Sequence, residues 1–366
     1  MKPWETDPAQ YDALFASKAD TVEARFREFA APAAQRFSSP VEGYRVRAEF
    51  RVWHDGDELN YVMFDPESPR DPVAITGFSP ALASIQTLMP VLQARLRVEP
   101  VLRRKLFQVE FMGSTDGEML VTLIYHRPLD ERWETMASDL AKELSIAIVG
   151  RSRRQKVVIG RDYIHDSFTV GGQRFRYRQY EQSFVQPNGP VNEQMLNWAQ
   201  GQCADATGDL LELYCGNGNF TLPLATRFEQ VIATELSKSG TRAAQANITD
   251  NNVGNVQVIR LSAEEVSQAL DGVRPFRRLA ALPKPLGDYD LRTVFVDPPR
   301  AGLDELTLQC VQRFERILYI SCNPETLLAN LSVLHPHYEI KALAFFDQFP
   351  YTPHLETGVL LQRPVD

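Results

Sequence analysis

The sequence predicts an α/β protein in which a doubly wound, Rossmann-like domain follows an α+β domain with an antiparallel sheet. From residue 181 onward, short apolar strands alternate with helical segments, which is typical of a parallel sheet covered by helices on both faces. Before residue 181, residues alternate between apolar and polar, and glycine-containing turns separate the runs, which indicates hairpins. We therefore expect two domains, residues 1–180 and 181–366.

The expected first domain begins with a helix. Apolar residues recur at helical spacing from Tyr11 to Phe29, so residues 1–38 are expected to be helical. The sequence leaves open whether this segment packs on the second domain. Further helices are expected over about 80–98 and 130–146.

Hairpins make up the rest of this domain. From Tyr44 to Val52 every second residue is apolar and the residues between are mostly basic, so we expect a strand with one buried face. Turn signals follow at Asp55-Gly56, at residues 114–117 and at Gly171-Gly172.

The second domain carries five apolar runs that read as strands. Each run ends in polar residues, and a helical segment or a loop follows it. The proline- and arginine-rich stretch 272–291 is expected to be a surface loop. The predicted strands cover residues 209–214, 231–236, 256–261, 293–299 and 316–324.

Composition excludes several classes of protein. The chain has 366 residues, 44% of them hydrophobic, which is enough to bury a full core. No run approaches the roughly 18 to 20 apolar residues of a membrane span, and the first residues lack the apolar run of a signal peptide. The four cysteines show no metal-type spacing, so we expect free thiols. We therefore expect a cytoplasmic protein without membrane association.

The net charge of −8 is unevenly distributed. Residues 1–180 hold 25 basic and 25 acidic residues, and residues 181–366 hold 14 and 22, so the second half carries the whole deficit. Between Arg151 and Tyr180 there are eight basic residues and two acidic ones. This strip fits a surface that binds a polyanion, and it fits an ordinary solvated face equally well.

A nucleoside-binding site is expected at the ends of the second domain's strands. The Gly216-Asn217-Gly218 turn directly follows the first strand and allows the backbone to approach a ligand closely. Because Thr221 and Leu222 follow where a dinucleotide fingerprint has its third glycine, a pyrophosphate is not favoured. Glu235, which ends the next strand, can accept both hydroxyl hydrogens of a ribose, and Asp297 is held by Pro298 at the tip of the fourth strand.

These features describe the binding of S-adenosylmethionine. The structural alternative is a tight turn with a helix-capping glutamate.

Four segments resemble the motifs of the RNA uracil-5-methyltransferase family: LELYCGNGNF, FVDPPRAGLD, YISCNPETL and FDQFPYTPHLE. The segments SPVEGYRVRAEFRVWHDGD and SFVQPN are similar to its tRNA-specific branch. The resemblance covers nearly the whole chain. It implies methyl transfer from S-adenosylmethionine to carbon 5 of the T-loop uridine at position 54 of tRNA, and it extends to the T-like loop of tmRNA.

The chemistry of such a reaction requires a nucleophile and a base. Carbon 5 of uracil attacks a methyl sulfonium only after a thiolate has added to carbon 6, and the C5 proton must then be removed. Cys322 lies at the tip of the fifth strand, next to the start of a helix, whose positive end would lower the thiol's pKa. A buried structural cysteine is the alternative, as expected for Cys310. The resemblance assigns the base to Glu356, and His354 is a rival two residues earlier.

The resemblance also implies cofactor contacts and the absence of a metal. Some family members carry an N-terminal iron–sulfur cluster, but no cysteine precedes Cys203 here, so no metal or cluster is expected and tRNA is favoured over ribosomal RNA. The implied cofactor-binding residues are Gln186, Tyr214, Asn219, Glu235 and Asp297.

The RNA must present a flipped-out uridine, because a stacked base cannot reach a thiol in a crevice. Phe107 is a candidate to stack on loop bases, although a core position fits it equally well, and the same holds for Trp53. No obligate protein partner is evident. The alternatives are a ribosomal RNA uracil-5-methyltransferase and an RNA-folding protein whose methyl transfer is secondary. The expected phosphate contacts are Arg45, Arg47, Arg51, Arg174, Arg176 and Arg178.

Overall fold

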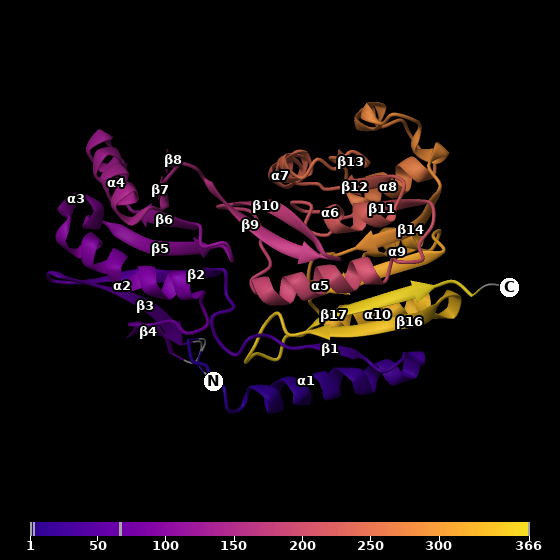
Figure 1. The fold of residues 1–366 in the computed structure, drawn as a ribbon, viewed down its shortest axis with the longest axis horizontal. Coiled ribbons are helices and arrows are strands. Elements are labelled where there is room, and N and C mark those ends of the chain that lie inside the picture. Colours follow the sequence, from indigo (N-terminus) through magenta and orange to yellow (C-terminus); the bar gives the residue numbers. More distant parts are fainter. Residues whose placement is uncertain (1, 3, 66–67, 365–366) are drawn as a thin grey trace. The chain divides into compact units, whose positions relative to one another are not determined.

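The computed structural model describes residues 2, 4–65 and 68–364, and the chain divides into two compact units. Unit 1 comprises Met1–Ala9, Pro40–Ser167 and Arg178–Gly189, and unit 2 comprises Gln10–Ser39, Phe168–Tyr177 and Pro190–Asp366. The chain passes between the units repeatedly, whereas the sequence predicts one boundary after residue 180. Figure 1 labels the elements of both units.

Unit 1 is built on a sheet in the order β4-β3-β2-β5-β6-β7-β8. Neighbouring strands are antiparallel except for β6 and β7, which confirms the predicted hairpins. The sequence reading did not identify β4, β7 and β8. The bounds are β2 (Arg47–Asp55), β3 (Glu58–Asp65), β4 (Ser68–Ala74), β5 (Leu106–Gly113), β6 (Met119–Tyr125), β7 (Ala147–Ser152) and β8 (Gln155–Ile159).

One face of this sheet is apolar and is packed against helices. Along β2, Phe50 and Val52 are buried in the same core as Trp133, whereas Arg51 and Trp53 are exposed. The helices that complete this core are α2 (Ala83–Val98), α3 (Pro100–Arg103) and α4 (Glu131–Leu144). The predicted two-residue period of β2 is thus confirmed, and its basic residues lie on the face away from these helices.

The hairpin of β9 (Tyr163–Val170) and β10 (Gln173–Tyr180) turns at Gly171 and Gly172, as predicted. Both glycines have positive φ, +57° and +80°, which matches the tight turn that such a pair favours.

Unit 2 contains a sheet in the order β1-β16-β17-β15-β14-β11-β12-β13. Strands β13, β12, β11, β14 and β15 run parallel, which confirms the doubly wound sheet, and β17 runs antiparallel to β15. The sequence reading did not identify β1, β16 and β17. The bounds are β1 (Gln35–Phe37), β11 (Asp209–Leu213), β12 (Val231–Thr234), β13 (Val256–Ile259), β14 (Leu291–Val296), β15 (Arg316–Ser321), β16 (Glu339–Phe346) and β17 (Glu356–Gln362).

Both faces of this sheet are buried. Along β14, Val294 and Val296 join one core cluster and Phe295 joins the other. Residues 272–290 form the predicted irregular loop with two short 3-10 turns, Arg277–Ala281 and Leu286–Asp288. The helices are α1 (Tyr11–Phe26), α5 (Gly189–Gly201), α6 (Thr221–Leu224), α7 (Lys238–Asp250), α8 (Ala263–Leu270), α9 (Glu305–Val311) and α10 (Pro324–Leu334), with further 3-10 turns at Arg27–Phe29, Ala225–Arg227 and His335–His337.

The N-terminal helix α1 belongs to unit 2. Its Tyr11, Phe15 and Phe26 enter the core cluster of the parallel sheet, and Phe26 packs edge-on against Phe345 at 6.0 Å between ring centroids. After the 3-10 turn, residues 35–37 form β1 parallel to β16 rather than the expected continuation of the helix (Figure 1). Long-range pairing with β16 thus determines the conformation at 35–37, where the sequence shows only three residues of weak pattern.

Candidate functional site

Five adjacent strands of unit 2 bring candidate residues to one edge of the sheet. Tyr214, Glu235, Asp297 and Cys322 directly follow the parallel strands β11, β12, β14 and β15, so all four lie at the carboxyl edge. Glu356 begins β17, which is antiparallel to β15, and the pairing of Ser321 with Thr357 brings it to the same edge. In open α/β sheets, ligands bind at this edge.

The glycine turn after β11 is fixed by the carboxylate of the next strand. The Gly216 N–H donates to Glu235 Oε2 at 3.0 Å, and the Ser237 N–H donates to Glu235 Oε1 at 2.6 Å. Gly216 and Gly218 have φ of +56° and +83°, a region that favours glycine. A Cβ built on Gly240 would lie 2.9 Å from Glu235 Cγ, so the helix after β12 must approach this carboxylate closely. The glycine turn and the Glu235 carboxylate thus hold each other in place.

Asn219 is held in a reciprocal amide pair with Asn192 of α5. Asn192 Nδ2 donates to Asn219 Oδ1 at 3.0 Å, and Asn219 Nδ2 donates to Asn192 Oδ1 at 2.8 Å. The Tyr177 hydroxyl donates to the Asn219 carbonyl at 3.0 Å. Asn192 was missed by sequence reasoning, because nothing in the periodicity of a helix marks a side chain that pairs with a distant loop.

Tyr214 adopts a left-handed backbone conformation, with φ of +61°. Such a conformation is strained for a residue with a Cβ, and it turns the chain sharply out of β11 into the glycine turn. Burial raises the pKa of the half-buried phenol, which also contacts Thr307 of α9. The backbone of Tyr214 therefore contributes to the carboxyl edge while its ring packs on the α9 side.

Cys322 is half-buried between the end of β15 and the start of α10, whereas the other three cysteines are buried. Burial, together with the negative charges of Glu356 and Asp297, raises the pKa of its thiol to about 11. From the sequence alone, the positive end of the helix after Cys322 is expected to lower this pKa. The structure gives the opposite direction, because desolvation and the two neighbouring carboxyl groups all raise the pKa of the thiol.

Two carboxyl groups lie beside the thiol: Glu356 is buried and Asp297 is half-buried. Burial raises the pKa of both groups, and the charge of Asp297 raises that of Glu356 further. Two neighbouring carboxyls in a poorly solvated site do not both ionise readily, so the pair retains a proton to higher pH than an isolated carboxyl would. A carboxylate of raised pKa is also a stronger base.

His354 lies two residues before Glu356, in the loop that leads into β17. Burial, together with the charges of Arg300 and Lys18, lowers the pKa of its imidazole. An Arg300 Nη2 lies 3.4 Å from His354 Nδ1. The ring is therefore neutral near pH 7 and can accept a proton, which keeps it chemically competent as a rival base.

Gln186 lies in unit 1, so it is not among the residues that the sheet edge of unit 2 brings together. Its segment is held by polar contacts within unit 1. One Nη of Arg47 donates to the carbonyls of Tyr180 and Ser183, both at 2.9 Å, and the Val46 N–H donates to the Pro187 carbonyl at 3.0 Å.

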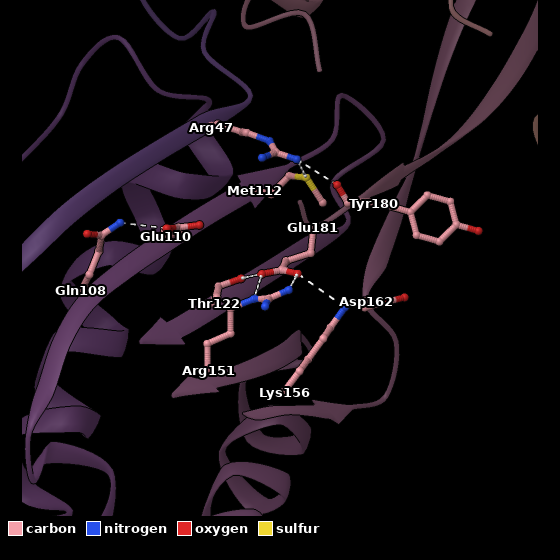
Figure 2. A network of polar contacts seen from close by, with 10 residues as sticks. All are labelled: Arg47, Gln108, Glu110, Met112, Thr122, Arg151, Lys156, Asp162, Tyr180 and Glu181. Atoms are coloured by element: carbon pink, nitrogen blue, oxygen red, sulfur yellow. Dashed lines mark hydrogen bonds and ion pairs between the residues drawn. The ribbon is translucent and has the colours of Figure 1, made fainter. Parts of the chain in front are cut away.

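A second set of contacts fixes the start of the same segment (Figure 2). Glu181 is buried and accepts two hydrogen bonds from the Arg151 guanidinium, at 2.5 and 2.6 Å. Lys156 lies 3.5 Å from the same carboxylate. Arg47 and Arg151, which the sequence predicts to belong to basic surfaces, thus also hold the backbone that carries Gln186.

An aromatic stack lies on the polar face of the unit 1 sheet. The Arg51 guanidinium lies 3.9 Å from the centre of the Phe107 ring, and Phe107 stacks on His126 with 4.0 Å between ring centroids and 25° between planes. Phe107 is half-buried and His126 is exposed, so the stack is not part of the core. His126 was missed, although its position after the apolar run of β6 marks it as a residue at a strand end.

The remaining arginine candidates are divided between the two units. Arg45 and Arg178 are half-buried in unit 1, while Arg174 and Arg176 are exposed on β10 in unit 2. Arg178 lies over the Tyr163 ring at 5.4 Å.

Within the described part of the chain, no group of three or more His, Cys, Asp and Glu side chains is placed to hold a metal ion. Nor does any described helix have the length and apolar character needed to cross a bilayer.

A doubly wound sheet with a glycine turn after its first strand and a carboxylate after the second fits the Rossmann-like methyltransferase class. The model of the tRNA (uracil-5-)-methyltransferase family matches residues 10–364, and the chain belongs to this family. It is an enzyme family, which agrees with the resemblance in the motifs.

Curated relatives are similar along their whole length. A protein of Ectopseudomonas mendocina, named tRNA/tmRNA (uracil-C(5))-methyltransferase, is 54% identical over 98% of this chain and 98% of its own. One of Azotobacter vinelandii with the same name is also 54% identical, with the same coverage. The crystal structure of the Pyrococcus abyssi tRNA (uracil-54, C5)-methyltransferase in complex with S-adenosyl-L-homocysteine superposes with a TM-score of 0.73 over 96% of this chain and 83% of that one. At 21% identity, that likeness shows the shared fold.

Proposed function

We propose that this enzyme transfers a methyl group from S-adenosylmethionine to carbon 5 of uridine 54 in the T loop of tRNA, and that the T-like loop of tmRNA is a second substrate. The observation that carries the proposal is a thiol, Cys322, flanked by the carboxyl groups of Glu356 and Asp297 at the ligand-binding edge of a doubly wound sheet. The names of the curated relatives support the choice of substrate.

Cys322 is the proposed nucleophile. Its thiol loses a proton and its sulfur adds to carbon 6 of the uracil, which turns the ring into an enolate with a nucleophilic carbon 5. Because burial and two carboxyl groups raise the pKa of the thiol, the free enzyme holds it protonated near pH 7. Proton removal is therefore coupled to substrate binding, and the Asp297 carboxylate beside the sulfur is suited to accept that proton, which leaves Glu356 free for the later step.

Glu356 is the proposed general base of the second half of the reaction. After methylation, carbon 5 carries both the methyl group and a hydrogen. Removal of that hydrogen by Glu356 restores the ring double bond as the C6–S bond breaks, and the electron pair of that bond returns to the sulfur. Burial strengthens the basicity of Glu356. Its position at the start of β17 opposite the end of β15 supports this choice over His354.

S-adenosylmethionine supplies the methyl group when bound. The site fits a nucleoside: Gly216 and Gly218 have no side chains to obstruct a ligand, and the Glu235 carboxylate is fixed beside this turn. We propose that Glu235 accepts hydrogen bonds from the ribose hydroxyls and that the Asn219 amide is oriented for its contact by Asn192. Tyr214, Asp297 and Gln186 complete the proposed cofactor contacts.

Unit 1 is the proposed RNA-recognition domain, and unit 2 is the proposed methyltransferase domain. The stack of Arg51, Phe107 and His126 supports this proposal, because such a surface can accept an unstacked base and a phosphate. Arg47 contributes chiefly by holding residues 180–183. The other proposed phosphate contacts are Arg45, Arg174, Arg176 and Arg178.

The enzyme is proposed to act in the cytoplasm, where its RNA substrate is found, without an obligate protein partner. The rival substrate is a ribosomal RNA uridine. The test is incubation of purified tRNA, tmRNA and ribosomal RNA fragments with labelled S-adenosylmethionine, followed by mass mapping. We expect 5-methyluridine at position 54 of tRNA. Label confined to ribosomal fragments would refute the proposal, and RNA refolding by the Cys322→Ala variant would reveal an additional folding activity.

A further inference from the structure

A single lysine of the N-terminal helix holds the loop that leads into Glu356. The ammonium of Lys18, on α1, lies 2.6 Å from Asp347 Oδ1 and donates to the carbonyls of Phe349, Thr352 and His354 at 3.1, 3.1 and 2.9 Å. All of these residues belong to unit 2. The ammonium thus has four oxygen atoms of residues 347–354 around it, so it ties together several points of this loop and is not an ordinary surface charge.

The ion pair of Lys18 and Asp347 is largely shielded from water. The side chain of Lys18 is 11% exposed and that of Asp347 is 1% exposed. The pKa of Lys18 is lowered by burial, and the charge of Asp347 and its hydrogen bond to the ammonium offset only part of this effect. Tyr11, seven residues earlier on α1, contacts Asp347 through its hydroxyl and packs edge-on against Tyr351 at 5.8 Å. One face of α1 thus contacts both ends and the middle of the loop.

This loop is short and joins two paired strands. β16 ends at Phe346, β17 begins at Glu356, and these two residues pair with each other across the sheet. Residues 347–355 therefore form the whole turn between them. The sheet fixes the backbone of Glu356 on one side, and the approach to it from His354 depends on the contacts that Lys18 makes.

We propose that Lys18 is a positioning residue for the proton-transfer step. By holding the carbonyls of residues 349, 352 and 354, it sets the orientation of the Glu356 carboxyl and of the His354 ring relative to Cys322. The inference rests on the proposed function, in which Glu356 removes the C5 proton. A displacement of about 1 Å in a reacting group can lower a rate by up to about 100-fold, so a distant anchor of this kind has a measurable effect.

Removal of the lysine alone would be ambiguous, because it leaves Asp347 buried without its cation and destabilises the fold. The informative variant is therefore Lys18→Met with Asp347→Asn, which removes both charges and all three carbonyl contacts. A matched control is Arg25→Met, which removes a cation from the same helix but breaks only an exposed ion pair with Glu325. Lys18→Arg tests whether another donor can restore the contacts.

In the double variant we expect the melting temperature and the Kd for S-adenosylhomocysteine to stay close to the parent values. We expect kcat for tRNA methylation to fall by at least about tenfold, with accumulation of covalent protein–RNA adduct because elimination stalls. Lys18→Arg should recover part of the rate, and Arg25→Met should leave it unchanged. Parental kcat in the double variant would overturn the proposal, since Lys18 would then serve only as the charge partner of Asp347.

A second measurement does not depend on methyl transfer. Hydrogen exchange should speed up in residues 347–355 of the double variant and stay unchanged in β15. Unchanged exchange in the loop would overturn the inference even if the enzyme were active. A third outcome separates the two proposals. If the parent enzyme did not methylate tRNA but exchange in the loop were faster in the double variant, the proposed function would be refuted and the role of Lys18 in holding the loop would stand.

Discussion

Cys322 and Glu356 lie at the same edge of unit 2, one at the end of β15 and the other at the start of its antiparallel neighbour β17. Burial and then the charge of Glu356 raise the pKa of the Cys322 thiol to about 11. The same burial raises the pKa of Glu356. Thiol and carboxyl thus both hold their protons to a higher pH than they would in water.

Cys322→Ala is expected to abolish methyl transfer and the covalent RNA adduct while the Kd for S-adenosylhomocysteine stays within about twofold of the parent. Without the sulfur, no enolate forms and carbon 5 cannot attack the methyl group. Adduct on denaturing gels and isothermal titration measure the two effects. The control is Cys310→Ala, which removes a buried sulfur from the core around α9. Normal turnover by the Cys322→Ala variant would contradict the proposed covalent mechanism.

Glu356→Gln is expected to trap the methylated adduct, because addition and methyl transfer proceed while loss of the C5 proton stalls. Single-turnover assays should show adduct formation with release of labelled RNA slowed by about 100-fold or more. Glu325→Gln, at an exposed position in the first turn of α10, serves as the control. If His354→Ala trapped the adduct and Glu356→Gln did not, the base would be His354.

The strand-end residues were predictable because their signals are local. Apolar runs that end in polar or glycine residues, as at Tyr214, Glu235, Asp297 and Cys322, place those residues at one edge of a parallel sheet without any coordinates. The hairpins of unit 1 were predictable for the same reason. Gly171-Gly172 and the alternating β2 need only their immediate neighbours in the sequence to specify their conformation.

Features that depend on distant partners were not predictable from the sequence. The strand at residues 35–37 forms because β16 lies beside it, some 300 residues later in the chain. Lys18 looks like an ordinary surface lysine of an amphipathic helix until Asp347 is placed opposite it. The direction of the Cys322 pKa shift likewise depends on burial and on two carboxyls from other strands, so the helix that follows in sequence gave the wrong sign.

Glu235→Gln is expected to weaken S-adenosylhomocysteine binding by about 10- to 100-fold, which corresponds to about 1.4 to 2.7 kcal/mol. The amide keeps one oxygen acceptor, but the charged acceptor for two ribose hydroxyls is lost, and so is one of the two bonds that hold the turn at Gly216 and Ser237. Calorimetry measures the change. Glu229→Gln, at an exposed position before β12, should bind like the parent. Equal affinity in both variants would place the ribose elsewhere.

Arg51→Met is expected to weaken tRNA binding and to lower the slope of log Kd against log salt by about one, because one phosphate contact is lost. Phe107→Ala should weaken binding without changing that slope, since stacking on a base releases no counterion. Fluorescence titrations at several salt concentrations measure both. The control is Arg132→Met on α4, a helix that covers the opposite face of the unit 1 sheet. An unchanged slope for Arg51→Met would assign that arginine to packing on Phe107 alone.

Glu212, in the middle of β11, gives unit 2 a pH-dependent stability. Burial raises the pKa of its carboxyl from 4.5 to about 8. In the unfolded chain the carboxyl ionises from about pH 4.5 upward, while the folded protein retains the proton until about pH 8. The contribution to stability is therefore fully present below pH 4.5 and is lost as the pH rises toward 8, with a limiting slope of about 1.4 kcal/mol per pH unit.

Glu212→Gln removes this ionisation and should flatten the corresponding part of the curve of unfolding free energy against pH. The comparison is made by urea denaturation between pH 5 and pH 8.5, and the quantity of interest is the difference between parent and variant, because the coupled pair of Glu356 and Asp297 titrates in both. Glu264→Gln, at an exposed position on α8, should follow the parent curve. Parallel curves for the parent and Glu212→Gln would mean that Glu212 ionises at the same pH in the folded and unfolded chain, so that its burial carries no cost.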